Sequence, residues 1–164
     1  MTGRAVLIGV LLALPCTGFA QDADAVTKAV LDHRLTVELV KRAVAVDRGL
    51  LALMEKDPSI ARRGSEKTAG IDATVKAMEA VPELAAALNA NGISARDYIL
   101  TQMALIPTTM MHELVASGRM PALPPGMPAH NVEFWKANYD VLKPLEAEWK
   151  KNREAITKFA NRKR

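Results

Sequence analysis

Two long segments of the chain place mostly apolar side chains at alternating spacings of three and four residues. The first series is Val26, Val30, His33, Val37, Val40, Val44, Asp47, Leu51 and Met54, and the second is Trp135, Asn138, Leu142, Leu145, Trp149, Asn152, Ile156 and Phe159. This spacing brings side chains onto one face of an α-helix. A further stripe in the first segment, Leu35, Leu39, Val46, Leu50 and Leu53, widens its apolar face beyond a narrow seam. The pattern predicts an all-α helical bundle.

The first helix is predicted to run from Val26 to Met54, although Thr36 could instead be the N-cap of a shorter helix. Asp57-Pro58 ends the segment, and residues 58 to 70 read as a connector. Pro82 is expected to end one short helix or to begin the next, which the pair Asn91-Gly92 terminates.

Ser94 is a predicted N-cap, with Asp97 three residues later. The helix that follows is expected to reach about Ser117 and to be kinked by Pro107. Its predicted apolar face consists of Ile99, Met103, Ile106, Met110 and Leu114.

A proline-rich stretch from Gly118 to His130 is expected to form a stiff loop before a long C-terminal helix. Asn131 is the predicted N-cap of that helix, and Pro144 should kink it or divide it in two. With the preceding segments, this gives a predicted bundle of four to five helices in one domain, residues 21–164.

Residues 1–20 have the features of a signal peptide: Arg4, an uncharged apolar run from Ala5 to Leu14, and small residues before Gln21. The apolar run is about half the ~20 residues that cross a bilayer. We therefore expect cleavage after Ala20, a periplasmic or secreted protein, and no transmembrane anchor. Pro15 before Cys16 argues against a lipidated cysteine.

Cleavage at this position would remove Cys16, the single cysteine, and would lower the formal net charge from +4 to +3. A chain without cysteine forms no disulfide, cysteine zinc site, cysteine nucleophile or thioether-linked haem. A nucleic-acid partner is not expected for an exported protein of such modest charge.

Four polar residues in the two long series, His33, Asp47, Asn138 and Asn152, predict a specific pairing. If the two helices pack antiparallel with their midpoints level, His33 lies near Asn152 and Asp47 near Asn138. Buried polar pairs of this kind fix helix register. The alternative is that these residues lie where the seam reaches solvent.

Sequence motifs for catalysis are sparse, and we predict no enzymatic activity. His112-Glu113 resembles the start of the zinc motif H-E-x-x-H, but Ala116 occupies the position of the second histidine. No nucleophile elbow, P-loop or dinucleotide fingerprint is present.

Methionine and histidine residues gather between positions 103 and 130. Thioether and imidazole ligands select Cu(I), so Met111, His112, Met127 and His130 are candidate copper ligands. Methionines at helical spacing more commonly fill a core, as expected for Met103 and Met110. Copper is therefore an alternative prediction, and otherwise no cofactor is expected.

The C-terminal segment is basic and rich in aromatic residues. Its cations either complement the helix dipole or attract anionic lipid headgroups. Its aromatic side chains either anchor the core or form a partner surface.

Leu35-Thr36-Val37-Glu38 resembles the start of the L-T-x-x-Q element of small periplasmic stress and chaperone proteins of the Spy and CpxP type, with Leu39 in place of the glutamine. The run from Gly92 to Tyr98, followed by the proline-rich stretch, also looks like small secreted all-α bacterial proteins of unassigned function. These resemblances imply an exported helical binding protein, chaperone-like or active in envelope stress. Its partner would be another protein or an envelope component, and a homodimer is possible.

Overall fold

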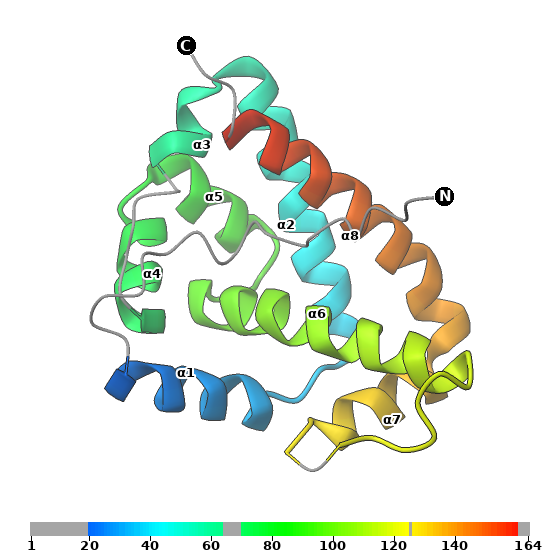
Figure 1. Ribbon diagram of the computed structural model, residues 1–164. Helices are drawn as coiled ribbons and strands as arrows, with labels where there is room; N and C mark the ends of the chain where they lie inside the picture. The colour runs from blue at the N-terminus through cyan, green and yellow to red at the C-terminus, as the bar shows by residue number, and fades with distance from the viewer. Residues whose placement is uncertain (1–19, 64–69, 125, 161–164) are drawn as a thin grey trace, which may run out of the picture.

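The structure is a computed structural model that describes residues 20–63, 70–124 and 126–160. Within these ranges every regular element is an α-helix (Figure 1). There are eight: α1 (Ala20–Asp32), α2 (Val37–Lys56), α3 (Ser59–Arg63), α4 (Gly70–Glu79), α5 (Pro82–Ala90), α6 (Ala95–Ala116), α7 (Ala129–Ala137) and α8 (Tyr139–Ala160). The all-α prediction is confirmed, whereas the predicted number of four to five helices is not.

The first predicted helix is interrupted: residues 33–36 are not helical and separate α1 from α2. Thr36 has an extended backbone, and its hydroxyl accepts a hydrogen bond from the Leu39 amide at 3.1 Å. This bond satisfies one of the free N–H groups at the start of α2. The prediction of one continuous helix is therefore wrong, and the alternative with Thr36 as N-cap is confirmed.

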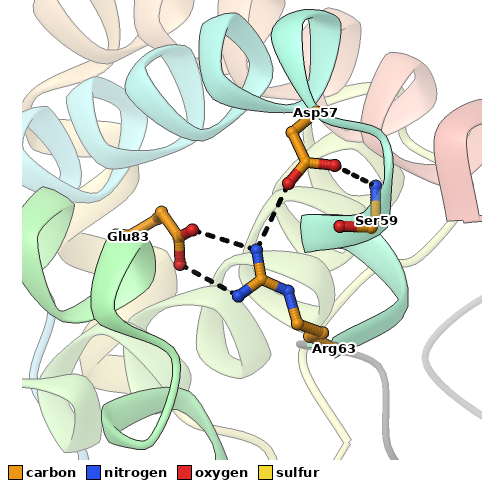
Figure 2. A network of polar contacts seen from close by, with 4 residues as sticks. All are labelled: Asp57, Ser59, Arg63 and Glu83. Carbon is orange, nitrogen blue, oxygen red and sulfur yellow. Dashed lines mark hydrogen bonds and ion pairs between the residues drawn. The ribbon is translucent and has the colours of Figure 1, made fainter.

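A small polar network fixes the turn from α2 into α3 and attaches it to α5 (Figure 2). The Asp57 carboxylate accepts a bond from the Ser59 amide at 2.9 Å. The Arg63 guanidinium donates to both Glu83 oxygens, at 3.0 and 3.3 Å, and lies 3.4 Å from Asp57. Glu83 lies in the first turn of α5, where a negative charge is favourable to the helix dipole.

Local signals place the next helix ends as predicted. Pro82 occupies the first turn of α5, and Gly92 adopts a φ of +61° just after its end. The Ser94 hydroxyl accepts from the Asp97 amide at 3.0 Å and starts α6. These predictions are confirmed. They could be made from the sequence because each depends only on residues within one helical turn.

The predicted apolar face of α6 is confirmed at Ile99, Met103 and Ile106, which lie in or against the core clusters, but it is wrong at Met110. Met110 is 43% exposed, whereas Thr101 and Thr108 are fully buried. Helices α1, α2, α4, α5 and α7 all contact α6, so its burial extends around most of its circumference in the first half. A helix covered around most of its circumference buries residues outside any single apolar stripe, such as Thr101 and Thr108.

Between α6 and α7 the described residues form turns and bends, and Pro125 lies outside the described part. The predicted long C-terminal helix is divided, but the break occurs at Asn138, and Pro144 lies inside α8. Pro128, not Asn131, is the N-cap of α7. Asn131 lies one turn further on, where its side chain is fully buried in a contact described below.

Helices α2 and α8 form the most extensive helix pair and run in the same direction (Figure 1). Val40 and Val44, near the start of α2, share a core cluster with Leu142 near the start of α8. Met54, at the other end of α2, shares a cluster with Phe159. The predicted antiparallel packing is therefore wrong.

The buried apolar side chains form two clusters. The larger lies between the C-terminal half of α2, α4, α5 and the start of α6, and includes Leu50, Leu84 and Tyr98. The smaller lies between the start of α2, the middle of α6, α7 and α8, and contains Trp135 and Trp149. Asp47 and Gln102 lie between the two clusters, because they bond to Tyr98 of the larger cluster and Trp149 of the smaller one.

None of the helices in the described part is both long and apolar enough to cross a membrane. Of the predicted signal peptide, residues 1–19 lie outside the described residues.

Candidate functional site: a buried polar network and a surface hollow

A buried carboxyl group lies at the meeting point of α2, α6 and α8. Asp47 of α2 is only 1% exposed. Its Oδ1 accepts a hydrogen bond from the Tyr98 hydroxyl of α6. The Gln102 amide nitrogen, one turn further along α6, lies 3.0 and 2.9 Å from the two carboxyl oxygens. Both oxygens of this buried group therefore face donors, as buried polar groups require.

The other end of the Gln102 amide contacts α8. Its Oε1 accepts from the Trp149 indole N–H at 2.6 Å and from the Arg153 guanidinium at 3.1 Å. Indole and guanidinium groups only donate, so the amide oxygen must face α8 and the amide nitrogen must face Asp47. The guanidinium carbon of Arg153 also lies 5.5 Å from the centre of the Trp149 ring. The network therefore has one consistent orientation across three helices.

Burial dominates the electrostatics of this network. It raises the pKa of Asp47 from 3.8 to about 6, against the opposing effects of the Tyr98 and Gln102 hydrogen bonds and the charge of Arg153. Burial also raises the pKa of Tyr98 well above its usual value, with Asp47 acting in the same direction. The free-energy cost of removing the charged carboxylate from water exceeds the stabilisation that these donors provide.

The predicted polar seam residues have partners other than those expected. Asp47 pairs with Tyr98 and Gln102 instead of Asn138, whose side chain donates to the Phe134 carbonyl of α7 at 2.9 Å. Asn152 is buried on α8. The predicted pairs assumed antiparallel helices, and the parallel arrangement instead places Arg48 against Glu148, with nitrogen–oxygen distances of 2.7 and 3.0 Å.

His33 and His130 belong to a second polar contact, which holds the turn between α1 and α2. His33 Nε2 lies 3.0 Å from the Thr101 hydroxyl, and His130 Nε2 lies 3.4 Å from the His33 carbonyl oxygen. The Asn131 amide donates to that same carbonyl and accepts from the Leu35 N–H, both at 2.9 Å. Burial lowers the pKa of His33, with Asp97 opposing. Asn131 thus bonds to a distant turn, which explains why it does not cap α7.

On the surface, a shallow hollow of about 400 Å³ lies between the end of α6 and the start of α8. It is lined by His112, Glu113, Ala116, Ser117, Arg119 and Tyr139. The His112 and Tyr139 rings are 5.0 Å apart with planes inclined by 32°. The sequence singled out His112, but not the aromatic partner that α8 brings to it.

The helix ends that form this hollow also carry exposed apolar side chains. Among the described residues the large hydrophobic side chains that remain exposed are Met110 (43%), Val115 (37%), Tyr139 (36%) and Val141 (49%). At 100° per residue, Met110 lies about 160° and Val115 about 60° around α6 from His112, and neither side chain lines the hollow itself. Val141 lies two residues beyond Tyr139 and so leaves α8 on a different side. We call Met110, Val115 and Tyr139 the apolar rim.

Charged side chains of both signs lie at and beside the hollow: three cations, Arg119, Lys143 and Lys150, and three acids, Glu113, Asp140 and Glu146. Lys150 is neutralised, because its Nζ lies 3.0 Å from Glu113 and 2.6 Å from Glu146. Lys143 lies over the Tyr139 ring at 5.6 Å, and the Arg119 Nε donates to the Ser117 hydroxyl at 3.0 Å. In the described part of the chain, neither Lys143 nor Arg119 forms an ion pair with an acidic residue.

The four candidate copper ligands occupy different surroundings. Met111 is buried, Met127 is half-buried between α6 and α7, His112 contacts Tyr139, and His130 approaches the His33 carbonyl. Within residues 20–63, 70–124 and 126–160, no three His, Cys, Asp or Glu side chains are grouped as a metal ion would require. The copper hypothesis therefore stays a prediction.

The basic C-terminal segment is partly neutralised within α8 and its neighbours. Lys158 pairs with Glu154 at 2.8 Å, Lys150 pairs with two acids, and Arg153 belongs to the buried network. The structure thus gives three of these cations local partners.

Sequence reasoning missed Tyr98, Gln102 and Arg153. A signal was present, since Tyr98 and Gln102 are four residues apart, as are Trp149 and Arg153, and such pairs share a helix face. Their common partner could be identified only from the packing of α2, α6 and α8.

No family model matches the chain, and neither the curated proteins nor the solved structures include one with significant similarity to it.

Proposed function

We propose that this chain is an exported, non-enzymatic binding protein with chaperone-like action. Its binding surface is the hollow between α6 and α8 together with the apolar rim. Its ligand is a partly unfolded polypeptide that exposes both apolar and acidic side chains. The observation that carries this proposal is that the exposed large hydrophobic side chains of the described chain gather in the last turns of α6 and the first turns of α8.

The chemistry of this surface supports such a ligand. Met110 provides a flexible, polarizable contact, and Tyr139 provides a partly exposed aromatic face, both of which are typical of surfaces that bind varied partners. Arg119 and Lys143 add positive charge at its edge, and the chain as a whole carries a formal charge of +4. Because Arg119 lines the hollow, it is available to pair with an acidic side chain of a ligand.

The contacts of Ser117 favour binding over catalysis at the hollow. Its hydroxyl donates to the Leu114 carbonyl at 3.2 Å and accepts from Arg119. These bonds make the hydroxyl part of the end of α6, and a nucleophile would instead need a base within hydrogen-bonding distance.

The export part of the proposal depends on residues 1–20, whose charge, apolar run and small residues favour a signal peptide. Edman sequencing of the protein recovered from a bacterial periplasm tests it. An N-terminus at Gln21 is expected, and retention of the full chain in the cytoplasm contradicts it.

The binding part is tested by the aggregation of reduced insulin in the presence of the purified protein. Because Met110 and Val115 are exposed, Met110→Lys with Val115→Lys should leave the fold intact. We expect about fivefold weaker suppression of aggregation, the factor that 1 kcal/mol of binding represents.

The matched control is Ala52→Lys with Ala86→Lys, two exposed positions on α2 and α5. This variant should suppress aggregation as the unmodified protein does. Equal loss in both variants would show a non-specific effect of charge, and no suppression by the unmodified protein would refute the proposed function.

A further inference from the structure

Asp47 differs from the other buried acidic residue of the described chain. Glu146 is 9% exposed and lies 2.6 Å from the Lys150 ammonium group. Asp47 is more deeply buried, and no cation of the described residues touches its carboxyl group; Arg153 reaches only the far side of Gln102. A buried carboxylate without a cation in contact is unfavourable, and protonation relieves this cost.

The charged and titratable groups around Asp47 come from two helices. Helix α6 contributes the Tyr98 hydroxyl, and α8 contributes Arg153, which favours the ionised carboxyl, and Glu148, which disfavours it. Helices α3 and α5 also contact α2, and the side chains that they place in the adjoining core are apolar: Ile60, Leu84 and Leu88. The single cation that acts on Asp47 is therefore partly offset by Glu148.

We propose that Asp47, Tyr98 and Gln102 form a proton-dependent latch between α2, α6 and α8, which binds a proton in mildly acidic solution and then holds the three helices together more strongly. This inference concerns the stability of the fold and is independent of the proposed binding function. Protonation keeps the same neighbours but reverses one hydrogen bond: the carboxyl O–H of Asp47 donates to the Tyr98 oxygen, the Tyr98 hydroxyl no longer donates to Asp47, and Gln102 continues to donate to the other carboxyl oxygen.

The sign follows from the direction of the pKa shift. Folding raises the pKa of Asp47 from 3.8 to about 6, so the folded protein binds the proton more tightly than the unfolded chain. The resulting stabilisation is complete only below the unfolded pKa of 3.8 and is lost as the pH rises through about 6. Between pH 7.5 and 5.0 it multiplies the folding equilibrium constant by about tenfold.

Other groups have the opposite sign. Burial lowers the pKa of His33, and ion pairs lower the pKa of Glu83, Glu148 and Glu154, so these residues favour the folded state at higher pH. The latch must therefore be measured as a difference between the unmodified protein and Asp47→Asn, in which these contributions largely cancel.

Urea unfolding at pH 5.0 and 7.5 provides this difference. From pH 7.5 to 5.0, the folding constant of the unmodified protein should increase about tenfold relative to that of Asp47→Asn. The control Asp72→Asn, at an exposed position on α4, should behave as the unmodified protein does. The same pH dependence in the unmodified protein and in folded Asp47→Asn would overturn the proposal.

A second measurement keeps the proposal testable if Asp47→Asn does not fold. A carbon-13 NMR titration of the folded, unmodified protein should show an aspartate carboxyl that titrates near pH 6. Tyr98→Phe removes a donor to the ionised group and should move this midpoint upward, whereas the exposed-tyrosine control Tyr139→Phe should not. The absence of any aspartate midpoint above about pH 4.5 would refute the latch.

Discussion

The Asp47 network and the hollow contain similar chemistry but differ in their access to water. Each joins α6 to α8 through acidic, basic and aromatic side chains. In the network the bonds among Asp47, Tyr98, Gln102 and Trp149 are buried and only the Arg153–Gln102 bond is part-buried, whereas Glu113 and Lys150 near the hollow are about half exposed. Buried hydrogen bonds therefore contribute strongly to stability, and the exposed pairs contribute little and leave their side chains free to meet a ligand.

The largest expected effect is the loss of Gln102, which connects all three helices. Gln102→Leu leaves the Trp149 N–H and Arg153 without their acceptor and Asp47 without one of its donors. We expect the free energy of unfolding to fall by about 3–5 kcal/mol in urea titrations at pH 7.5. Addition of Asp47→Leu should restore part of this loss, because an apolar pair replaces a broken polar one. A decrease of less than about 1 kcal/mol in the free energy of unfolding of Gln102→Leu would show that water reaches the network.

A smaller effect is expected at the turn between α1 and α2. Asn131→Ala removes a buried hydrogen bond from the Leu35 N–H and a part-buried one to the His33 carbonyl. We expect a loss of about 2–3 kcal/mol in unfolding free energy, together with faster amide hydrogen exchange in α1. The exposed Asn89→Ala on α5 is the control and should change stability by less than about 0.5 kcal/mol. Equal effects in both variants would exclude the proposed role of Asn131.

The smallest effect on stability is expected at the hollow itself. Arg119→Glu should change the unfolding free energy by less than about 0.5 kcal/mol, because this side chain is exposed. It should nevertheless weaken the suppression of insulin aggregation about threefold, and more so at low salt. Lys76→Glu, an equivalent charge reversal on α4, should leave suppression unchanged. The comparison between network and hollow fails if Arg119→Glu unfolds the protein.

The same contrast explains what the sequence could predict. Thr36, Ser94 and Gly92 act on residues within one helical turn, so the ends of α2, α5 and α6 could be recognised. Asp47 was singled out as a polar residue in an apolar series, and it is buried. Its partners could not be identified, because they depend on α2 and α8 running parallel, which the spacing of apolar residues does not specify.

The hollow was only partly foreseeable for a related reason. His112 attracted attention as a possible metal ligand, and the aromatic residues of the C-terminal segment were expected to serve either as core anchors or as a partner surface. The structure assigns Trp135 and Trp149 to the core and leaves Tyr139 partly exposed beside His112. Tyr139 begins α8 because α7 ends at Asn138, whereas the sequence pattern predicted a kink or division of the helix at Pro144.

The most direct test of the central claim is amide hydrogen exchange of the protein with and without bound reduced insulin. We expect slower exchange on binding in residues 110–119 and 139–143, with little change in α4 and α5. Protection confined to α4 and α5, or no protection at the ends of α6 and α8, would contradict the claim that the protein binds through this hollow and its apolar rim.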